Sequence, residues 1–452
     1  MENLELYRDT LDKWCDMIRN NSGISPEKYG NDKVKRGLRN SDGTGVLAGL
    51  TNIGNVHGYV ISEDEKTPDE GSLSYRGIDV RDIVNACRKE GRFGYEEVCY
   101  LIMFGKLPTK QELIDFNELV STQRPVPYNF REDVIMKAPS PDIMNKLSRS
   151  VLTMYSYDTN PDSTDLLNMI RQSITLVSRV PTLVAYAYQA KRHYYDGKSL
   201  YIHNPQKELS TAENFLYMIR SDNKFTRLEA EILDLAFILH AEHGGGNNSA
   251  FTTRVVSSSG TDTYAAIGAA IGSLKGPKHG GANIRVMGMI DDFKAHLTDI
   301  TDRDQIAEHI RRIIKKESYD MSGLVYGMGH AIYTLSDPRA VLLKEKAREL
   351  ACETGNMDEF KLYETIEELT PEIFAELKGN KTMCANVDMY SGFVYKMLHI
   401  PVELYTPLFA VSRMAGWCAH RIEETMYGGK IIRPAYKSVS KKAEYINIED
   451  RV

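Results

Sequence analysis

The chain has 452 residues, of which 42% are hydrophobic and 26% are charged. These fractions are ordinary for a soluble globular protein and exclude a largely disordered chain. Lysine and arginine total 56, aspartate and glutamate total 62, and the formal net charge is −6 at pH 7. That balance gives no electrostatic basis for broad nucleic-acid binding, so we expect no nucleic-acid partner.

Cysteine usage and the N-terminal stretch indicate the compartment. The six cysteines contain no Cys-x-x-Cys pair, which argues against a zinc ribbon and suits a reducing cytosol. The stretch MENLELYRDTLDKWCDMIRN alternates charged and apolar residues, unlike a secretory signal, and its acidic residues argue against a transit peptide. No window approaches about 18 consecutive apolar residues, as a membrane span would. We expect a cytoplasmic protein without membrane contact.

The first region with a distinct pattern is residues 45–78. It contains Gly54, Gly58 and Gly71 among short runs such as YVIS and SLSY. This alternation of short apolar runs and glycines predicts one or two short strands with tight turns.

Most of the remaining sequence has helical periodicity. Segment 229–243 places apolar residues and His243 on one helix face, and segments 340–352 and 400–425 show the same pattern. We find no internal repeat or low-complexity tract. The sequence therefore predicts a mainly α-helical fold with a minor β element near the N-terminus.

Three glycine-rich loops, each with a histidine, follow one another in the second half of the chain. They are HGGGNN from His243, GPKHGGAN at 276–283 and YGMGHAIY at 326–333. Glycine permits close approach of the backbone to a ligand, and binding residues are concentrated in loops. These loops are the first candidates for a functional site.

The motif His240-Ala241-Glu242-His243 admits two interpretations. Two histidines at i and i+3 near a helix end could bind a metal ion, but the H-E-x-x-H order of zinc proteases is absent. No third ligand is identifiable from the spacing. We therefore favour a buried helix terminus with hydrogen-bonded histidines and predict no metal site.

His279 lies in a loop between two predicted helices. The helix before it, 264–275, carries Gly268 and Gly272, a spacing that lets a helix pack closely at a domain or subunit interface. The next helix begins just after the loop, and a helix N-terminus disfavours a charged imidazole. A neutral histidine there can donate a hydrogen bond to a developing enolate oxygen, as in triosephosphate isomerase. A loop histidine without a role is the equal alternative.

The third loop reads Gly327-Met328-Gly329-His330, which is neither a dinucleotide fingerprint nor a P-loop. Its glycines expose backbone amides that can hold a phosphate or an adenine edge. Shortly after it, Arg339 could bind a carboxylate with two parallel hydrogen bonds.

Three further residues have both an ordinary and a functional interpretation. Asp388, in NVDMYSG, is either a helix cap, the commoner role, or a base. Arg413 interrupts an apolar helix face, where an arginine usually has a buried anionic partner. Arg433, in IIRPAY, is most simply a solvated residue.

Taken together, these segments resemble the successive signatures of the citrate synthase family. The similarity runs from about residue 45 to 436, and five motifs in the family's order are far more specific than any one of them. The motifs are HAEH (240–243), GPKHGGAN (276–283), GMGHAIYTLSDPRA (327–340), NVDMYSG (386–392) and FAVSRMAGW (409–417), preceded by LSYRGIDVRDIV (73–84) and YEEVCYLIMFGKLPTKQEL (95–113).

The resemblance implies an acyltransferase of the tricarboxylic acid cycle that condenses acetyl-CoA with oxaloacetate and hydrolyses the citryl thioester. It assigns Asp388 as the base that removes a methyl proton from acetyl-CoA. His279 would stabilise the enol, and His330 would hold and protonate the oxaloacetate carbonyl. The two reactants are small-molecule substrates, and no cofactor is implied.

The resemblance also implies ligands for both substrates. His243, Arg339 and Arg413 would bind oxaloacetate together with His330. Arg433 would reach the active site of the neighbouring subunit, so a homodimer would be the active unit. The residues implied for CoA are Leu324, Val325, Gly327, Met328, Gly329, Lys381 and Asn386.

Two departures from the family pattern concern CoA. Ala331 and Thr334 stand where many bacterial relatives have cations that could meet the CoA phosphates. The ligands of those phosphates are therefore open, whereas the proposed catalytic residues are intact.

The resemblance implies two lobes, a large domain of residues 1–280 and 400–452 and a small domain of residues 281–399. One alternative is 2-methylcitrate synthase, which uses propionyl-CoA, since one methylene in an apolar pocket is worth only about 1–3 kcal/mol. Another is a non-catalytic homologue that binds metabolites, although the intact His279, His330 and Asp388 argue against it.

Overall fold

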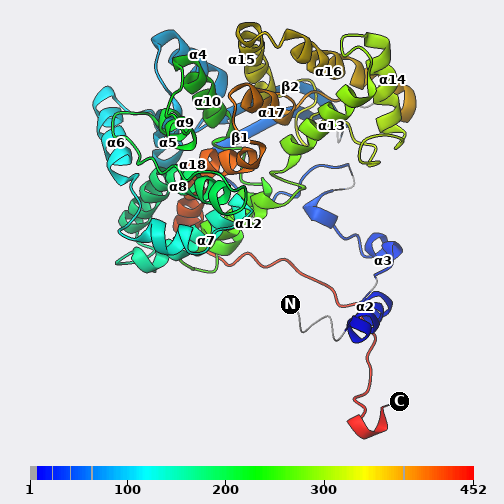
Figure 1. The fold of residues 1–452 in the computed structure, drawn as a ribbon. Helices are drawn as coiled ribbons and strands as arrows, with labels where there is room; N and C mark the ends of the chain where they lie inside the picture. Colours follow the sequence, from blue (N-terminus) through cyan, green and yellow to red (C-terminus); the bar gives the residue numbers. More distant parts are fainter. Residues whose placement is uncertain (1–7, 23, 41, 63–64, 380–381, 452) are drawn as a thin grey trace. The chain divides into compact units, whose positions relative to one another are not determined.

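The computed structural model describes residues 8–22, 24–40, 42–62, 65–379 and 382–451 (Figure 1). They belong to two compact units, residues 1–49 and 50–452. The first unit contains α2 (Arg8–Ser22), α3 (Pro26–Asn31) and a 3-10 turn at Arg36–Leu38. In the described ranges, no helix is long and apolar enough to cross a membrane.

The second unit is predominantly helical, which confirms the predicted fold class. Single turns of 3-10 or π helix, such as Arg131–Met136 and Val402–Leu404, connect some of its elements. Its α-helices are α4 (Val80–Glu90), α5 (Tyr95–Phe104), α6 (Lys110–Gln123), α7 (Ile143–Met154), α8 (Leu166–Tyr194), α9 (Thr211–Ile219), α10 (Arg227–His240), α11 (Asn248–Ser257), α12 (Thr263–Lys275), α13 (Ala282–His296), α14 (Arg303–Ile314), α15 (Pro338–Thr354), α16 (Met357–Lys378), α17 (Val387–Met397) and α18 (Tyr405–Tyr427).

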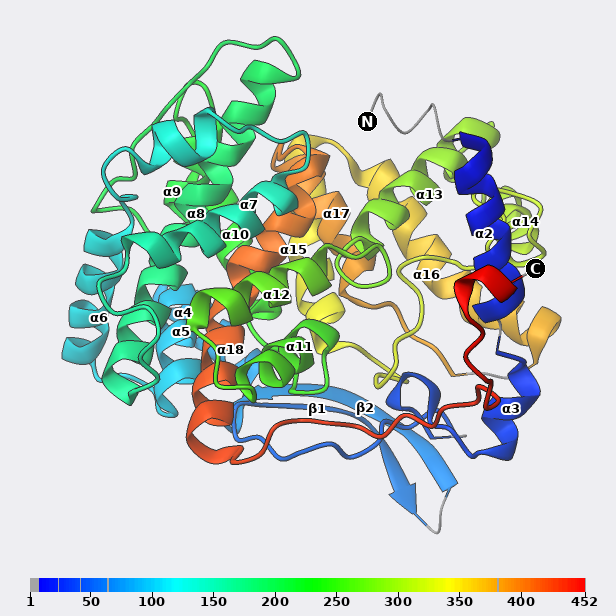
Figure 2. The ribbon, with the colours of Figure 1, turned by 90° about the horizontal axis from the view of Figure 1, so that it is seen from below.

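A small antiparallel sheet precedes these helices, where the glycine-rich region predicts strands. Its order is β1 (Gly54–Ser62), β2 (Glu65–Tyr75) and β3 (Ile78–Asp79). The first two strands have nine and eleven residues, longer than the short strands predicted. They form the hairpin seen below the helices in Figure 2.

The hairpin supports the loop that carries His330. A Cβ on Gly58 would lie 2.7 Å from the Cα of Tyr333, so only glycine permits this approach. Thr334 donates to the carbonyl of Gly58 and accepts a 3.1 Å hydrogen bond from the amide of Asp69. The side chain of Thr334 therefore links the His330 loop to the sheet.

The helices of the second unit form two groups in contact (Figures 1 and 2). Helix α18 contacts α5, α7, α8, α10, α11 and α12, whereas α13 to α17 contact one another. The second group lies within residues 281–399, which the resemblance assigns to a small domain. The division into a large and a small domain stays a prediction.

Two predicted helices differ from the observed ones at their ends. Segment 229–243 was expected to be helical to its end, but α10 stops at His240, because the chain turns at Ala241 and Gly244 has a φ of +79°. Segment 400–425 begins with Pro401 and a 3-10 turn, so α18 starts only at Tyr405.

Helix α12 packs closely on α7 at Gly268, whereas Gly272, the other glycine of the predicted pair, has no atom within 4 Å of its Cβ position. A Cβ on Gly268 would lie 2.9 Å from a methyl carbon of Leu152, and Ser148 donates a 3.3 Å hydrogen bond to the Gly268 carbonyl. This contact lies within one chain. A subunit interface at this helix stays a prediction.

The end of α10 is held by α18. Ser412 donates to the Phe237 carbonyl, and Arg413 Nε donates to the His240 carbonyl at 2.6 Å. One turn on, Gly416 lies against the chain that leaves α10, because a Cβ there would be 2.5 Å from the Ala241 carbonyl oxygen. These contacts fix where the His243 loop begins.

We expect Gly416→Ala to destabilise the protein. The added methyl cannot avoid a backbone oxygen, and such overpacking costs about 1–3 kcal/mol. A lower midpoint of thermal unfolding, followed by circular dichroism, would show this. Gly30→Ala is the control, because Gly30 also lies in a helix but has no atom near its Cβ position. Equal midpoints for both variants would contradict the proposed contact.

Candidate active site

His243 and His330 lie side by side although they are 87 positions apart in the sequence. Their rings are 5.2 Å apart at 88°, and both contact the ring of Tyr333. His243 Nε2 is 3.3 Å from the Tyr333 hydroxyl. The first and third glycine-rich loops therefore form one site.

The backbone fixes the tautomer of His330. Its Nδ1 accepts hydrogen bonds from the amides of Ile332 at 3.0 Å and Tyr333 at 3.2 Å. A ring nitrogen that accepts a hydrogen bond carries no proton, so the proton of a neutral His330 is on Nε2. The ring is thereby a donor on that side.

His279 is held between the end of α12 and the start of α13. Its Nε2 is 3.1 Å from the hydroxyl of Ser249, which also accepts a 3.0 Å hydrogen bond from the indole of Trp417. Burial, with the charge of Arg413, lowers the pKa of His279 to about 4. The imidazole is therefore neutral at physiological pH.

Asp388 lies in the first turn of α17. The cap of this helix is Asn386, whose Oδ1 accepts a 3.0 Å hydrogen bond from the Asp388 amide, so Asp388 is not itself the cap. Burial raises the pKa of Asp388 to about 6, the charge of Arg339 lowers it, and Asp337 raises it. A carboxyl group with this pKa is suited to act as a base near neutral pH.

Asn386 also joins α17 to the His330 loop. Its Nδ2 donates a 2.8 Å hydrogen bond to the Gly329 carbonyl, and its amide donates one of 2.8 Å to Gly327. Met328 and Ala385 form an antiparallel bridge beside it. Because one side chain serves both segments, Asp388 and His330 keep a fixed separation. The predicted contact of Asn386 with CoA stays a prediction.

Arg339 and Arg413 are both buried but differ in their partners. Arg339 makes two hydrogen bonds to the carboxylate of Asp337, at 3.0 and 2.7 Å. Arg413 is 0% exposed, and within the described part of the chain its Nη1 and Nη2 have no hydrogen-bond partner. The expected buried anion near Arg413 is Glu242, whose charge raises the pKa of Arg413, but among the described residues no carboxylate forms a hydrogen bond with its terminal nitrogens.

The charges of the buried arginines and of His330 all affect the surroundings of His243. Burial lowers the pKa of His243 well below its usual value, and the charges of Arg339, His330 and Arg413 lower it further. Burial also lowers the pKa of Arg413 to about 10, which still leaves it charged at neutral pH. A buried guanidinium with unpaired nitrogens is unfavourable unless an anion joins it. The site therefore suits a small anionic ligand.

Comparison with known proteins identifies the family. The model of the citrate synthase C-terminal domain matches residues 42–435. The chain belongs to the citrate synthase family. It is 32% identical to citrate synthase of Synechocystis sp., over 93% of this chain and 95% of that protein. It is also 30% identical to 2-methylcitrate synthase 1 of Corynebacterium glutamicum, over 93% of this chain and 99% of that protein.

Solved structures agree with this assignment. Citrate synthase from Pyrobaculum aerophilum is 30% identical with a TM-score of 0.74, and covers 92% of this chain and 95% of its own. The enzyme from Thermoplasma acidophilum is 26% identical with a TM-score of 0.75, over 92% and 99%. That structure is a ternary complex with carboxymethyl coenzyme A and oxaloacetate. The predicted citrate-synthase fold is thus confirmed.

The other residues that the citrate synthase resemblance implies differ in their exposure to solvent. Val325 is buried and Leu324 is 57% exposed, both in the loop before His330. Arg433 is exposed in the segment after α18, as expected for a solvated residue. Lys381 lies outside the described residues. The substrate contacts of all these residues stay predictions.

The HAEH motif is a helix terminus, as the favoured interpretation predicts. His240 is 1% exposed, and its Nδ1 is 2.8 Å from the Ala236 carbonyl. Burial lowers the pKa of His240 to about 3. Among the described residues, neither histidine of the motif belongs to a group of three potential metal ligands.

A buried network behind His243 was not found by sequence reasoning. Arg254 Nη2 donates to His420 Nδ1 at 2.7 Å, and His420 Nε2 donates to Glu242 at 2.9 Å. Since Glu242 precedes His243, this chain holds the loop from behind. His420 lies seven residues after Arg413 on one face of α18, so helical periodicity could have indicated it.

We expect Asn386→Ala to loosen the link between α17 and the His330 loop. It removes a helix cap and a hydrogen bond to Gly329, which together stabilise the fold by about 1–3 kcal/mol. Hydrogen exchange should become faster at the amides of Gly329 and Asp388. Asn386→Asp is the matched control, because it keeps the cap oxygen and loses only the Nδ2 donor. Unchanged exchange in Asn386→Ala would contradict this role.

Proposed function

We propose that this protein is a citrate synthase that condenses acetyl-CoA with oxaloacetate and water to give citrate and CoA. The observation that carries this proposal is Arg413, a fully buried guanidinium whose two terminal nitrogens have no partner among the described residues. It lies in the same cationic region as Arg339 and His243. A dianionic ketoacid supplies the charge that this region requires.

The chemistry requires a base and a donor in addition to these cations. A thioester methyl group is a weak carbon acid, so a carboxylate must remove the proton while a hydrogen bond stabilises the enolate oxygen. Asp388, with its pKa of about 6, serves as the base. Neutral His279 donates to the thioester oxygen through Nδ1–H, in the tautomer in which the Ser249 hydroxyl turns from Asn247 Oδ1 and donates a hydrogen bond to His279 Nε2.

The second reactant is activated by His330. Its Nε2–H donates to the ketone oxygen of oxaloacetate, a role supported by the two backbone amides on Nδ1. The enol carbon then attacks the ketone carbon, and the ketone oxygen takes the proton from His330. Water hydrolyses the resulting citryl thioester and releases CoA. The reaction is a group transfer that needs no cofactor besides its two substrates.

We further propose a homodimer as the active unit. Arg433 lies exposed in the segment after α18, where it can reach a second copy of the chain. Its guanidinium would add a cation to the oxaloacetate site of the partner. A cytoplasmic location fits the six free thiols, for which the structure contains no disulfide among the described residues.

The first experiment is the release of free thiol from acetyl-CoA with and without oxaloacetate. We expect release only with oxaloacetate, and a reduction of about a hundredfold or more in Asp388→Asn, because loss of general base catalysis costs this much. Oxaloacetate binding, measured by calorimetry, should be nearly unchanged in that variant. Asp358→Asn, an exposed carboxylate of α16, is the control.

The same assay with propionyl-CoA decides between the alternatives. Faster release from propionyl-CoA would establish 2-methylcitrate synthase instead, to which the chain is about as similar. A folded protein that binds oxaloacetate and releases no thiol from either substrate would be a non-catalytic homologue.

The pH dependence tests the base separately. Asp388 must be ionised to remove a proton, and its folded pKa is raised to about 6. We therefore expect kcat/KM to be constant above this pH and to fall by about tenfold per pH unit well below it. Oxaloacetate affinity and circular dichroism at each pH show whether binding or folding is lost instead. A flat profile down to about pH 5 would exclude Asp388 as the base.

A further inference from the structure

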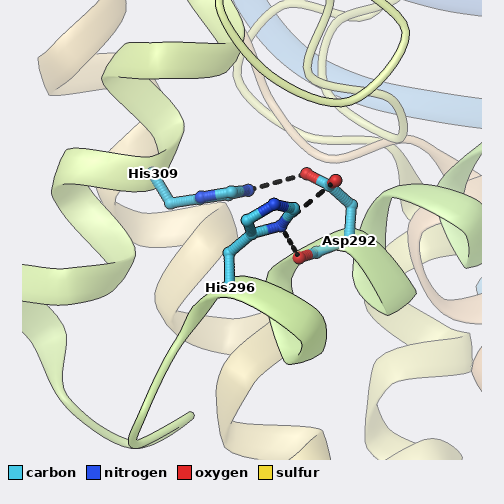
Figure 3. A group of neighbouring side chains, drawn as sticks. All are labelled: Asp292, His296 and His309. Atoms are coloured by element: carbon cyan, nitrogen blue, oxygen red, sulfur yellow. Dashed lines mark hydrogen bonds and ion pairs between the residues drawn. The ribbon is translucent and has the colours of Figure 1, made fainter.

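A second group of chemically active side chains lies at the end of α13. Asp292 and His296 are four residues apart in the last turns of this helix, and His309 faces them from α14 (Figure 3). One ligand atom of each residue lies within 4.8 Å of the others. Among the described residues, no other three histidine, cysteine or acidic side chains come this close.

Direct hydrogen bonds now hold the group together. His309 Nε2 is 2.8 Å from Asp292 Oδ2, and His296 Nδ1 is 2.8 Å from the backbone carbonyl of Asp292 and 3.3 Å, as an ion-pair contact, from its Oδ1. Ser318 Oγ donates to the same carboxylate at 3.2 Å. The two imidazole rings stack 5.3 Å apart at 28°, and Figure 3 shows both beside the carboxylate.

We propose that Asp292, His296 and His309 bind a divalent cation of the zinc class, which links α13 to α14. Two imidazoles and one carboxylate are a common ligand set for Zn²⁺, with bonds of about 2.0–2.2 Å. Ligand atoms around such an ion are about 3.3–3.5 Å apart, so only small side-chain movements are needed. Water would occupy the fourth position.

The surroundings favour a cation at this place. The carbonyl groups of the last turn of α13 give that helix end a negative partial charge. The three side chains differ in exposure. That of His309 is 3% exposed, that of Asp292 is 16% exposed and that of His296 is 45% exposed. The buried histidine provides a rigid ligand, whereas the exposed one leaves a path by which an ion can enter.

The alternative is that these side chains form hydrogen bonds only. The Asp292 carboxylate accepts from His309 and Ser318, and the Asp292 backbone carbonyl accepts from His296, so the described geometry is satisfied without an ion. The two interpretations differ in one measurable property, which is the binding of added metal. They do not depend on the proposed condensation, because none of these residues has a role in it.

The test uses the full-length chain, first stripped with a chelator, and Zn²⁺ as the probe in equilibrium dialysis. His243, His279 and His330 could bind Zn²⁺ elsewhere, so the native chain must be compared with His296→Ala. We expect the native chain to bind one Zn²⁺ more per chain than His296→Ala. His193→Ala removes another exposed helical histidine and should bind as the native chain does.

Two further measurements make the result specific. Asp292→Asn keeps an acceptor for His309 but loses the charge, and should weaken the extra site by about tenfold or more. Co²⁺ in the native chain should give the visible absorption of a tetrahedral site, and His296→Ala should lose it. Equal Zn²⁺ stoichiometry in native and His296→Ala chains would overturn the proposal in favour of hydrogen bonds alone.

Discussion

The candidate site depends on one close contact, the packing of α18 against the end of α10. Ser412 and Arg413 hold carbonyls of α10, and Gly416 allows the following backbone to approach. The same helix then holds Glu242 through His420. A single helix therefore ends α10, fixes the loop of His243 and places Arg413 beneath the site, so a fault in this packing would affect structure and ligand binding together.

The two buried arginines of the site differ in how their charge is balanced. Arg339 is neutralised by Asp337, whereas the terminal nitrogens of Arg413 have no partner in the described ranges. An unpaired buried cation lowers stability, and an anionic ligand that pairs with it removes that cost on binding. The fold thus leaves the terminal nitrogens of a buried arginine without hydrogen bonds, and departures of this kind from a fully satisfied interior are typical of functional sites.

The sequence predicted the helical class, the hairpin region and the three histidine loops, because these depend on local periodicity and glycine placement. It could not predict that Arg339 pairs with Asp337 or that Asn386 joins two segments, since such contacts depend on side-chain direction after folding. It placed the end of α10 three residues too late, because helical periodicity does not show the turn at Ala241, which α18 contacts after folding. The cluster at Asp292 was missed because His309 comes from another helix.

The three histidines of the site share one feature, which is that a ring nitrogen of each is engaged by a neighbouring group and the ring is thereby oriented. Each has a ring nitrogen engaged by the protein, His330 by backbone amides, His279 by Ser249 and His243 by Tyr333. Burial lowers the pKa of His243 and His279, so these two rings do not add to the positive charge of the arginines. A change of pH near neutrality therefore alters the charge of Asp388 before it alters that of either of these two rings.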